Sequence, residues 1–243
     1  MAVQNSLAKK AENTGIVEYE SGGQMVKLSP KMIRSYLVSG GGNVTDQEVM
    51  MFLSLCKFQH LNPFLREAYL IKFGNNPATM VVGIEVLLKR ASRNADYDGK
   101  LSGIIVQERE TGKIIEREGS FYIAEEERIV GGWAKVFIKG HSVPEYASVA
   151  FDEYAGRKGN GELNNQWATK PATMIRKVAI AHALREAFPE DMAGMYAPEE
   201  IPEASEIVLD DAAASEPVPV PEEKAEYSDI HAAVEDVQGA LFG

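Results

Sequence analysis

Basic residues gather between positions 157 and 185, in the most basic stretch of the chain. Lysine and arginine neutralise the phosphates of nucleic acids, and an aromatic ring such as that of Trp167 can stack on an unpaired base. This combination is what binding of single strands without sequence preference requires. The pattern is therefore compatible with a nucleic-acid ligand, and the candidate residues in this stretch are Arg157, Lys158, Trp167, Lys170, Arg176, Lys177 and Arg185.

The stretch from residue 166 to residue 196 is predicted to be mainly helical. At 100° per residue, Arg176, Lys177 and Arg185 share one half of the helical wheel. The other half is apolar and is expected to face the core; its residues are Ile175, Val178, Ala179 and Ala183. The alternative interpretation is an ordinary solvated face, since many amphipathic helices carry charges on the side away from the core. The wheel alone does not choose between the two.

The sequence carries no clear motif for nucleotide hydrolysis, metal binding or nucleophilic catalysis. A phosphate-binding loop needs the pattern GxxxxGK[ST], which is absent. Residues 96–99 resemble the start of a calcium loop, but Gln107 stands where a bidentate glutamate is needed. The four histidines lack the spacing of metal ligands, and Cys56 lies on an apolar helix face, which favours a small buried hydrophobe. We therefore expect neither catalysis nor a bound cofactor.

Charge is divided unevenly along the 243 residues, whose net charge is −11. Residues 198–243 hold 13 acidic residues and one lysine, whereas residues 1–197 hold 23 acidic and 24 basic residues. The acidic total therefore does not exclude a polyanionic ligand for the body of the chain. With one cysteine, a polar N-terminus and no apolar run near the ~20 residues that span a membrane, a soluble, cytoplasmic protein is expected.

Caps and periodicity predict the elements that position these residues. Residues 1–27 are expected to form a flexible arm. Ser29 is the expected cap of a short helix, and Thr45 with Glu48 forms a capping-box pattern before a longer one. The remaining elements follow in order: a hairpin at 67–82, a helix at 83–95, a second hairpin at 100–118, strands at 128–140 and 145–154, and the helix from 166.

Strands that cluster between helices favour an α+β fold with a mainly antiparallel sheet flanked by helices. We expect residues 28–197 to form one folded core. Residues 198–243 are expected to form a disordered, acidic, proline-containing tail, whose last residues, 228–243, could form a short helix.

Three segments, taken in order, resemble one family. The first is "TDQEVMMFLSLCKFQHLNPFLREAYLIKF", the second "MVVGIEVLLKRASRNADYDG", and the third "QWATKPATMIRKVAIAHALREAFPEDMAGMYAPEE". In the first, LNP and an aromatic residue precede a predicted strand. In the second, VVG leads from a strand into a helix. In the third, a Trp and a Pro precede a basic pair, and an Arg follows nine residues later. Together they resemble the RecT/Bet family of phage single-strand annealing proteins, most of all its lambda Red beta-like branch, over residues 30–200.

The resemblance implies that the protein is an ATP-independent recombinase, which acts in DNA recombination in a bacterial host cell. Such a protein coats single-stranded DNA, anneals it to a complementary strand to give a duplex, and forms a homo-oligomeric ring or helical filament. It also implies a phage exonuclease and the host single-strand-binding protein as partners. Magnesium could assist the annealing, with no site for it predicted in the protein.

The resemblance also assigns residues by position. The basic family positions on the last core helix are matched by Arg176, Lys177 and Arg185. Trp167 matches the family tryptophan, and Arg66, after LNPF, stands where relatives carry a basic residue near the DNA. The chain departs from the branch at Ala172 and Thr173, where basic residues are usual.

Three functional hypotheses follow. In the first, a groove of cations holds phosphates and leaves base edges free to pair with a second strand. In the second, the protein is a non-enzymatic adaptor that binds proteins through its acidic tail, and the basic helix is merely solvated. In the third, it is a metal-dependent nuclease, which the lack of a clear carboxylate constellation argues against.

Overall fold

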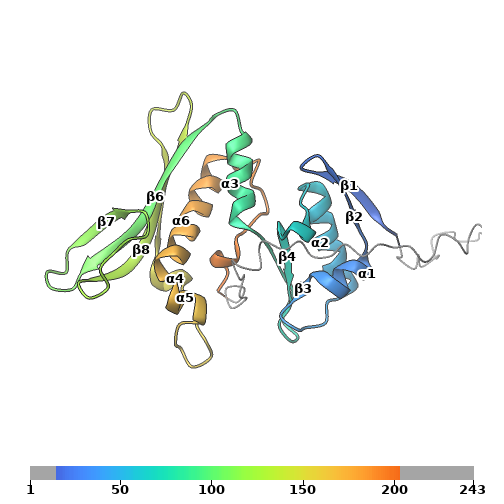
Figure 1. Cartoon of the computed structure of the whole chain (residues 1–243), viewed down its shortest axis with the longest axis horizontal. Helices are drawn as coiled ribbons and strands as arrows, with labels where there is room; N and C mark the ends of the chain where they lie inside the picture. The colour runs from blue at the N-terminus through green and yellow to red at the C-terminus, as the bar shows by residue number, and fades with distance from the viewer. Residues whose placement is uncertain (1–14, 203–243) are drawn as a thin grey trace, which may run out of the picture.

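The computed structural model describes residues 15–202, and the structural statements below concern this part of the chain. It has an α+β fold, as predicted. A large four-stranded sheet with helices on one face lies beside a smaller N-terminal part (Figure 1). No helix between residues 15 and 202 is long and apolar enough to cross a membrane. The predictions for residues 1–14 and 203–243, including the terminal helix, lie outside the described residues.

The N-terminal part begins with a hairpin, where the sequence predicted a flexible arm. Its antiparallel strands are β1 (Val17–Ser21) and β2 (Gln24–Leu28). The turn residues Gly22 and Gly23 have φ angles of 59° and 81°, which glycine adopts without strain. Buried Tyr19 donates a hydrogen bond from its hydroxyl to the carbonyl of Leu61 at 2.8 Å. The hairpin corrects the prediction for residues 17–27, because two strands of five residues give too short an alternation to stand out.

The helices after the hairpin begin at the predicted caps. They are α1 (Pro30–Met32), the π-helical turn η1 (Ile33–Leu37) and, after the short strand β3 (Val38–Ser39), α2 (Asp46–Phe58). The Ser29 hydroxyl accepts a hydrogen bond from the backbone N–H of Met32 at 3.2 Å. Thr45 and Glu48 exchange both bonds of the capping box, at 3.2 and 2.8 Å, which confirms that prediction.

A three-stranded sheet links the N-terminal part to the rest of the molecule. The elements here are the 3-10 turn η2 (Pro63–Leu65), β4 (Ala68–Ile71), β5 (Thr79–Val82) and α3 (Ile84–Arg93). Strand β4 pairs parallel with β3 and antiparallel with β5. The hairpin and the helix after it were both predicted, since the turn "GNNP" and the helix entry "VVG" are strong local signals.

The large sheet is fully antiparallel, with strand order β7-β6-β8-β9. Its strands are β6 (Tyr97–Glu108), β7 (Ile114–Glu118), β8 (Glu127–Ile138) and β9 (Glu145–Ala150), and the helices after it are α4 (Phe151–Tyr154), α5 (Asn165–Thr169) and α6 (Pro171–Ala187). Helix α6 packs so closely on β8 that a Cβ added at Gly132 would lie 2.6 Å from the carbonyl oxygen of Ile175. The single helix predicted from residue 166 is divided at Lys170, because Pro171 begins a new helix.

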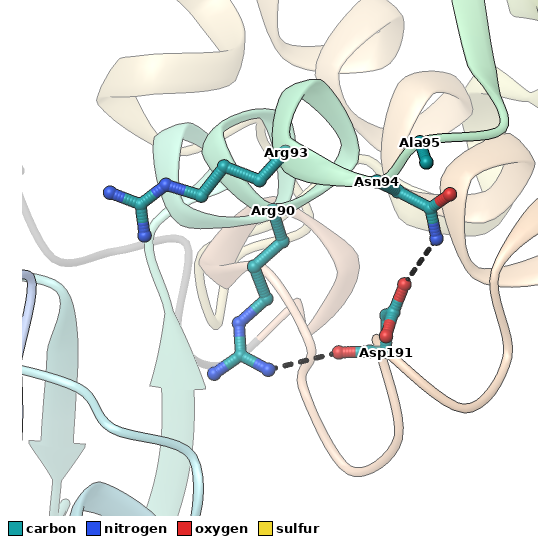
Figure 2. Close-up of a pocket in the computed structure, with 5 residues that line it drawn as sticks. All are labelled: Arg90, Arg93, Asn94, Ala95 and Asp191. Carbon is teal, nitrogen blue, oxygen red and sulfur yellow. Dashed lines mark hydrogen bonds between the residues drawn. The ribbon is translucent and has the colours of Figure 1, made fainter.

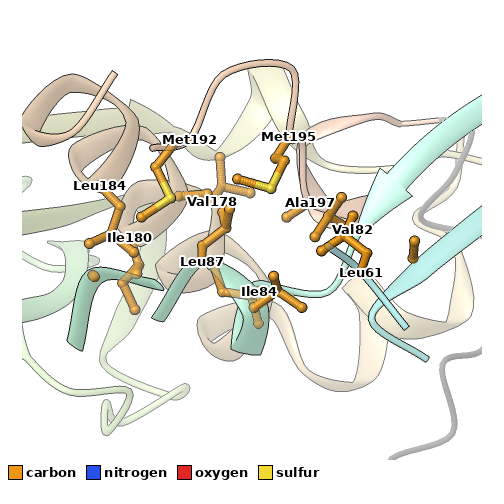
Figure 3. Close-up of a cluster of buried hydrophobic side chains, with 14 of the residues drawn as sticks. Leu61, Val82, Ile84, Leu87, Val178, Ile180, Leu184, Met192, Met195 and Ala197 are labelled. Atoms are coloured by element: carbon orange, nitrogen blue, oxygen red, sulfur yellow. The ribbon is translucent and has the colours of Figure 1, made fainter. Parts of the chain in front are cut away.

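The segment after α6 closes the core between the two parts of the molecule. Its buried residues include Met192, Met195 and Ala197, which lie against α3 and α6 (Figure 3). The backbone N–H of Val82 donates to the carbonyl of Tyr196 at 2.8 Å. The 3-10 turn η3 (Pro198–Glu200) follows, and Glu199 in it is buried. This corrects the predicted boundary at residue 198, since the core continues into the first residues assigned to the tail.

Candidate nucleic-acid interface

Arg157 and Lys158 lie on the glycine-rich loop between α4 and α5, which extends from the body of the molecule (Figure 1). Both side chains are exposed. The Arg157 guanidinium contacts the Asp152 carboxylate at 3.2 Å and donates to the Gly161 carbonyl at 3.1 Å. An exposed ion pair of this kind contributes little, and salt screens it. Both cations are therefore available to a phosphate in solvent.

Trp167 is fully buried, with none of its surface exposed. Its ring packs edge-on against Phe151, with ring centroids 5.4 Å apart, and its backbone N–H donates to the Asn164 side chain at 3.1 Å. The ring therefore anchors α5 to the core in this structure and is not placed to stack on a base. This corrects the expectation of an accessible ring. Trp167 is close to cations in the sequence, but its side chain points from α5 into the core.

Lys177 and Arg185 are held by carboxylates of η3. The Lys177 ammonium lies 3.1 Å from Glu199, and the Arg185 guanidinium binds both carboxylate oxygens of Glu200, one of them at 2.9 Å. The side chains of Glu199 and Glu200 are only 5% and 3% exposed. The Arg185 guanidinium also lies 4.8 Å from the ring centroid of Tyr196. These two cations thus hold the chain after α6 against the helix.

Arg176 has a different environment, although it precedes Lys177 directly. Its side chain is half-buried, and its Nε atom is buried with no hydrogen-bond partner among residues 15–202. The half-buried Lys100 is a neighbour: burial, then the positive charge of Arg176, lowers the pKa of Lys100, and Glu85 opposes this shift. Neither cation forms an ion pair within the described residues.

Lys100 was missed by sequence reasoning, although a signal was present. Ser102, Ile104 and Val106 of β6 are buried, and β6 is part of the sheet that α6 covers. In a strand, every second residue faces the same side, so Lys100 faces the helices with Ser102 and Ile104. Continuing the alternation of buried residues back to position 100 would have marked it as a lysine beneath α6.

Lys170 and Arg66 lie apart from this pair. Lys170 is exposed at the N-terminus of α6, close in sequence to the loop that holds Arg157 and Lys158. Arg66 ends η2 in the N-terminal part, with a left-handed φ of 60°. The cations therefore form four groups: the exposed ones at and before the start of α6, Arg176 of α6 with Lys100 of β6, the two paired with η3, and Arg66 by itself in the N-terminal part.

Alternative chemistry finds little support in side-chain placement. Within residues 15–202, no group of three or more His, Cys, Asp or Glu side chains is placed to hold a metal ion. Cys56 is buried on α2, and burial raises the pKa of its thiol to about 12, with the charge of Glu67 adding to the effect and a hydrogen bond with Tyr19 opposing it. At neutral pH this thiol stays protonated, so it is a packing residue.

Comparison with known proteins gives a match to a family model and a match to a related protein. A model of the RecT family matches residues 23–212 of the chain, which includes all the candidate residues. An uncharacterized protein of Ureaplasma parvum serovar 3 is 33% identical over 138 residues, which is 57% of this chain. That stretch covers 52% of the Ureaplasma protein, so the chain spans about half the length of this relative.

Proposed function

The chain belongs to the RecT family, and on that premise we propose that it binds single-stranded DNA and anneals it to a complementary strand without ATP. The observation that carries the proposal is the pair formed by Arg176 and Lys100. Both cations are half-buried, so they have lost part of their hydration, and neither forms an ion pair within residues 15–202. The charge of Arg176 disfavours the protonated form of Lys100, and Glu85 offsets this only in part. An anion between them removes both costs, and a phosphate diester is the anion that a strand supplies.

Annealing needs phosphate binding more than base recognition. Contacts to phosphates position a strand, and they carry no sequence information. Complementary pairing then supplies the specificity, so the protein needs no side chains that read bases. Cations on the bound strand also reduce its repulsion of a second strand, an effect that weakens as salt rises. Exposed Arg157, Lys158 and Lys170 would extend the phosphate path toward the N-terminus of α6.

The finer features of the proposal follow from the same residues. The sequence has no GxxxxGK[ST] loop for ATP, and it carries no clear catalytic constellation, so annealing itself is the proposed activity. Residues 15–202 of one protomer offer only a few exposed cations on this path, and a homo-oligomeric ring or filament would join these into a continuous groove. A phage exonuclease and the host single-strand-binding protein are the proposed partners, in the bacterial cytoplasm.

The test measures annealing of two complementary oligonucleotides without ATP. The variant Lys100→Gln with Arg176→Gln removes both charges. The matched control Lys113→Gln with Arg128→Gln removes two exposed charges, one just before β7 and one in β8. We expect the first variant to bind single-stranded DNA at least tenfold more weakly. The slope of log K against log salt should also become shallower by about 1.4, because each of the two lost contacts to a single strand contributes about 0.7.

The control variant should anneal like the wild type. Equal annealing by both variants would show that Lys100 and Arg176 are not the phosphate site. A wild-type protein that neither binds nor anneals strands would remove the proposed function itself. Imaging of the wild-type products on DNA tests the oligomer, since rings or filaments are expected.

A further inference from the structure

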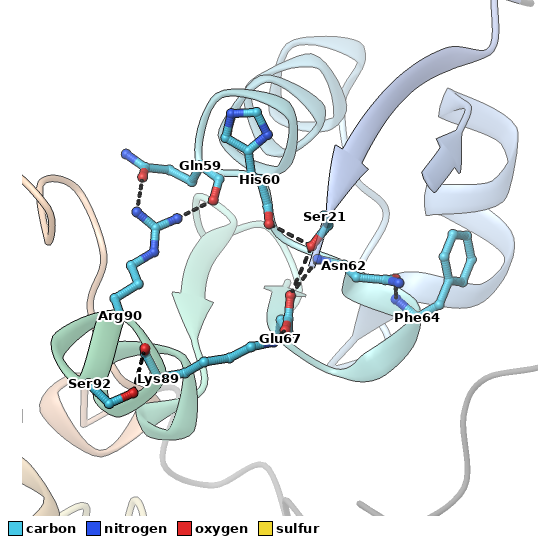
Figure 4. Close-up of polar contacts among 9 residues, drawn as sticks. All are labelled: Ser21, Gln59, His60, Asn62, Phe64, Glu67, Lys89, Arg90 and Ser92. Atoms are coloured by element: carbon cyan, nitrogen blue, oxygen red, sulfur yellow. Dashed lines mark hydrogen bonds and ion pairs between the residues drawn. The ribbon is translucent and has the colours of Figure 1, made fainter. Parts of the chain in front are cut away.

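Two adjoining hollows lie at the C-terminal end of α3, where none of the candidate residues is placed. One has a volume of about 340 Å³ and is lined by Arg90, Arg93, Asn94, Ala95 and Asp191 (Figure 2). The other, of about 210 Å³, extends toward the N-terminal part and is lined by Lys89, His60, Glu67 and others (Figure 4). Arg90 and Arg93 line both. The first volume is within the usual range of small-ligand sites, roughly 300–1,000 Å³.

Arg90 forms the wall between the hollows. Its guanidinium donates to the side-chain oxygen of Gln59 at 2.9 Å, to the Gln59 carbonyl, and to the Asp191 carbonyl at 3.0 Å. These three acceptors are neutral, so they orient the guanidinium without cancelling its charge. The bonds join the end of α2, the end of α3 and the segment after α6, which makes the wall rigid.

The two carboxylates that line the hollows already have partners. Glu67 pairs with Lys89 at 2.9 Å, and its other oxygen accepts the backbone N–H of Asn62 at 2.8 Å. The Asp191 carboxylate accepts the Asn94 side-chain amide at 2.6 Å. Three cations against two carboxylates leave an excess of one positive charge around the hollows.

Arg93 carries that excess. It is exposed, forms no hydrogen bond or ion pair within residues 15–202, and extends away from Asp191 (Figure 2). Lys89 lies one turn earlier on the same face of α3, since four residues correspond to about 400°. The hollow therefore presents one free guanidinium, that of Arg93, next to a lysine that is paired with Glu67 and an arginine that is held by neutral acceptors. A free guanidinium is a strong donor to phosphate oxygens.

We propose that the hollow around Arg93 binds a backbone phosphate of the same single strand that lies along α6. This inference rests on the proposed function and adds a second contact point to it. Helix α6 has 17 residues and is about 25 Å long. Lys170 precedes it and Asp191 follows it, so the two contact regions lie at opposite ends of the helix. At about 3.4 Å per nucleotide, the spacing of one strand in a DNA duplex, about seven nucleotides separate them.

The experiment uses the full-length chain and a fluorescent 20-nucleotide thymidine strand, with affinity measured by anisotropy over a range of salt. Arg93→Gln should weaken binding about tenfold and lower the salt slope by about 0.7, the contribution of one contact. Arg93→Lys should retain most of the affinity, because it keeps the charge. The control Arg128→Gln removes an exposed arginine from β8 and should bind like the wild type.

The outcomes separate this inference from the proposed function. If the wild type binds the strand and Arg93→Gln binds equally well, the inference is wrong and the proposed function stands. If the wild type does not bind the strand, the proposed function fails first. Thymidine monophosphate and inorganic phosphate, at matched ionic strength, test the source of the phosphate. The assignment to a strand would be wrong if either small anion bound the wild type as tightly as the 20-nucleotide strand and if Arg93→Gln abolished that binding.

Discussion

Two neighbouring positions on α6 show how side chains of the same charge take on different roles. Lys177 faces a buried carboxylate of η3, whereas Arg176 faces Lys100 and has no carboxylate partner among the described residues. A paired, partly buried cation contributes to the fold, and its removal leaves an unpaired buried charge. An unpaired, partly desolvated cation costs stability until an anion arrives. A cation's position in the sequence therefore says less about its function than the charge of the group it faces.

The largest expected effect comes from breaking the pair that holds η3. Arg185→Ala should lower the free energy of unfolding by about 3 kcal/mol, because it leaves the Glu200 carboxylate, 3% exposed, without its cation. Urea unfolding measures this, with Arg128→Ala as the control. If the two variants were equally stable, the pairing of Arg185 with Glu200 would not contribute to the stability of the fold.

Lys177→Gln should have a smaller effect of the same sign. The Lys177 side chain is 25% exposed, so solvent screens part of its attraction to Glu199, and a loss of about 1 kcal/mol is expected. Affinity for single-stranded DNA, measured per folded molecule, should change less than twofold. A tenfold loss of affinity at unchanged stability would instead place Lys177 among the phosphate contacts.

Arg176→Gln should change stability in the opposite direction. Removing one of two neighbouring cations relieves their repulsion, so the free protein should become more stable by about 0.5 kcal/mol while its affinity for DNA falls. Thermal unfolding with and without a 20-nucleotide strand measures both quantities. A destabilised Arg176→Gln variant would mean that this guanidinium supports the fold, as Arg185 does.

The smallest expected effect is a pH dependence at Lys100. Burial and Arg176 lower its pKa in the folded protein below the ordinary value of 10.5, so the unfolded chain holds the proton more tightly. Protonation therefore costs stability, and this cost disappears as pH rises through the lowered pKa toward 10.5. Relative to Lys100→Gln, the wild type should gain stability as pH rises from the lowered pKa toward the ordinary value. A difference that does not change with pH would contradict the lowered pKa.

Local signals in the sequence predicted much of the fold. The Ser29 cap, the Thr45–Glu48 capping box and the hairpins at β4–β5 and β6–β7 lie where residue types and spacing placed them. Each depends on contacts between residues close in the chain. The β1–β2 hairpin was missed because its strands are short and because its burial also depends on a distant partner: Tyr19 bonds to Leu61, 42 residues away.

By itself, the sequence determined the α+β class, the main helices and strands, and the concentration of basic residues before and along α6. Only the tertiary structure decided which of those residues are free. It turned Trp167 into the core, set Glu199 and Glu200 against Lys177 and Arg185, and brought Lys100 of β6 beside Arg176. The physical reason is that a charge interacts strongly only with groups a few ångströms away, and those neighbours come from distant parts of the chain.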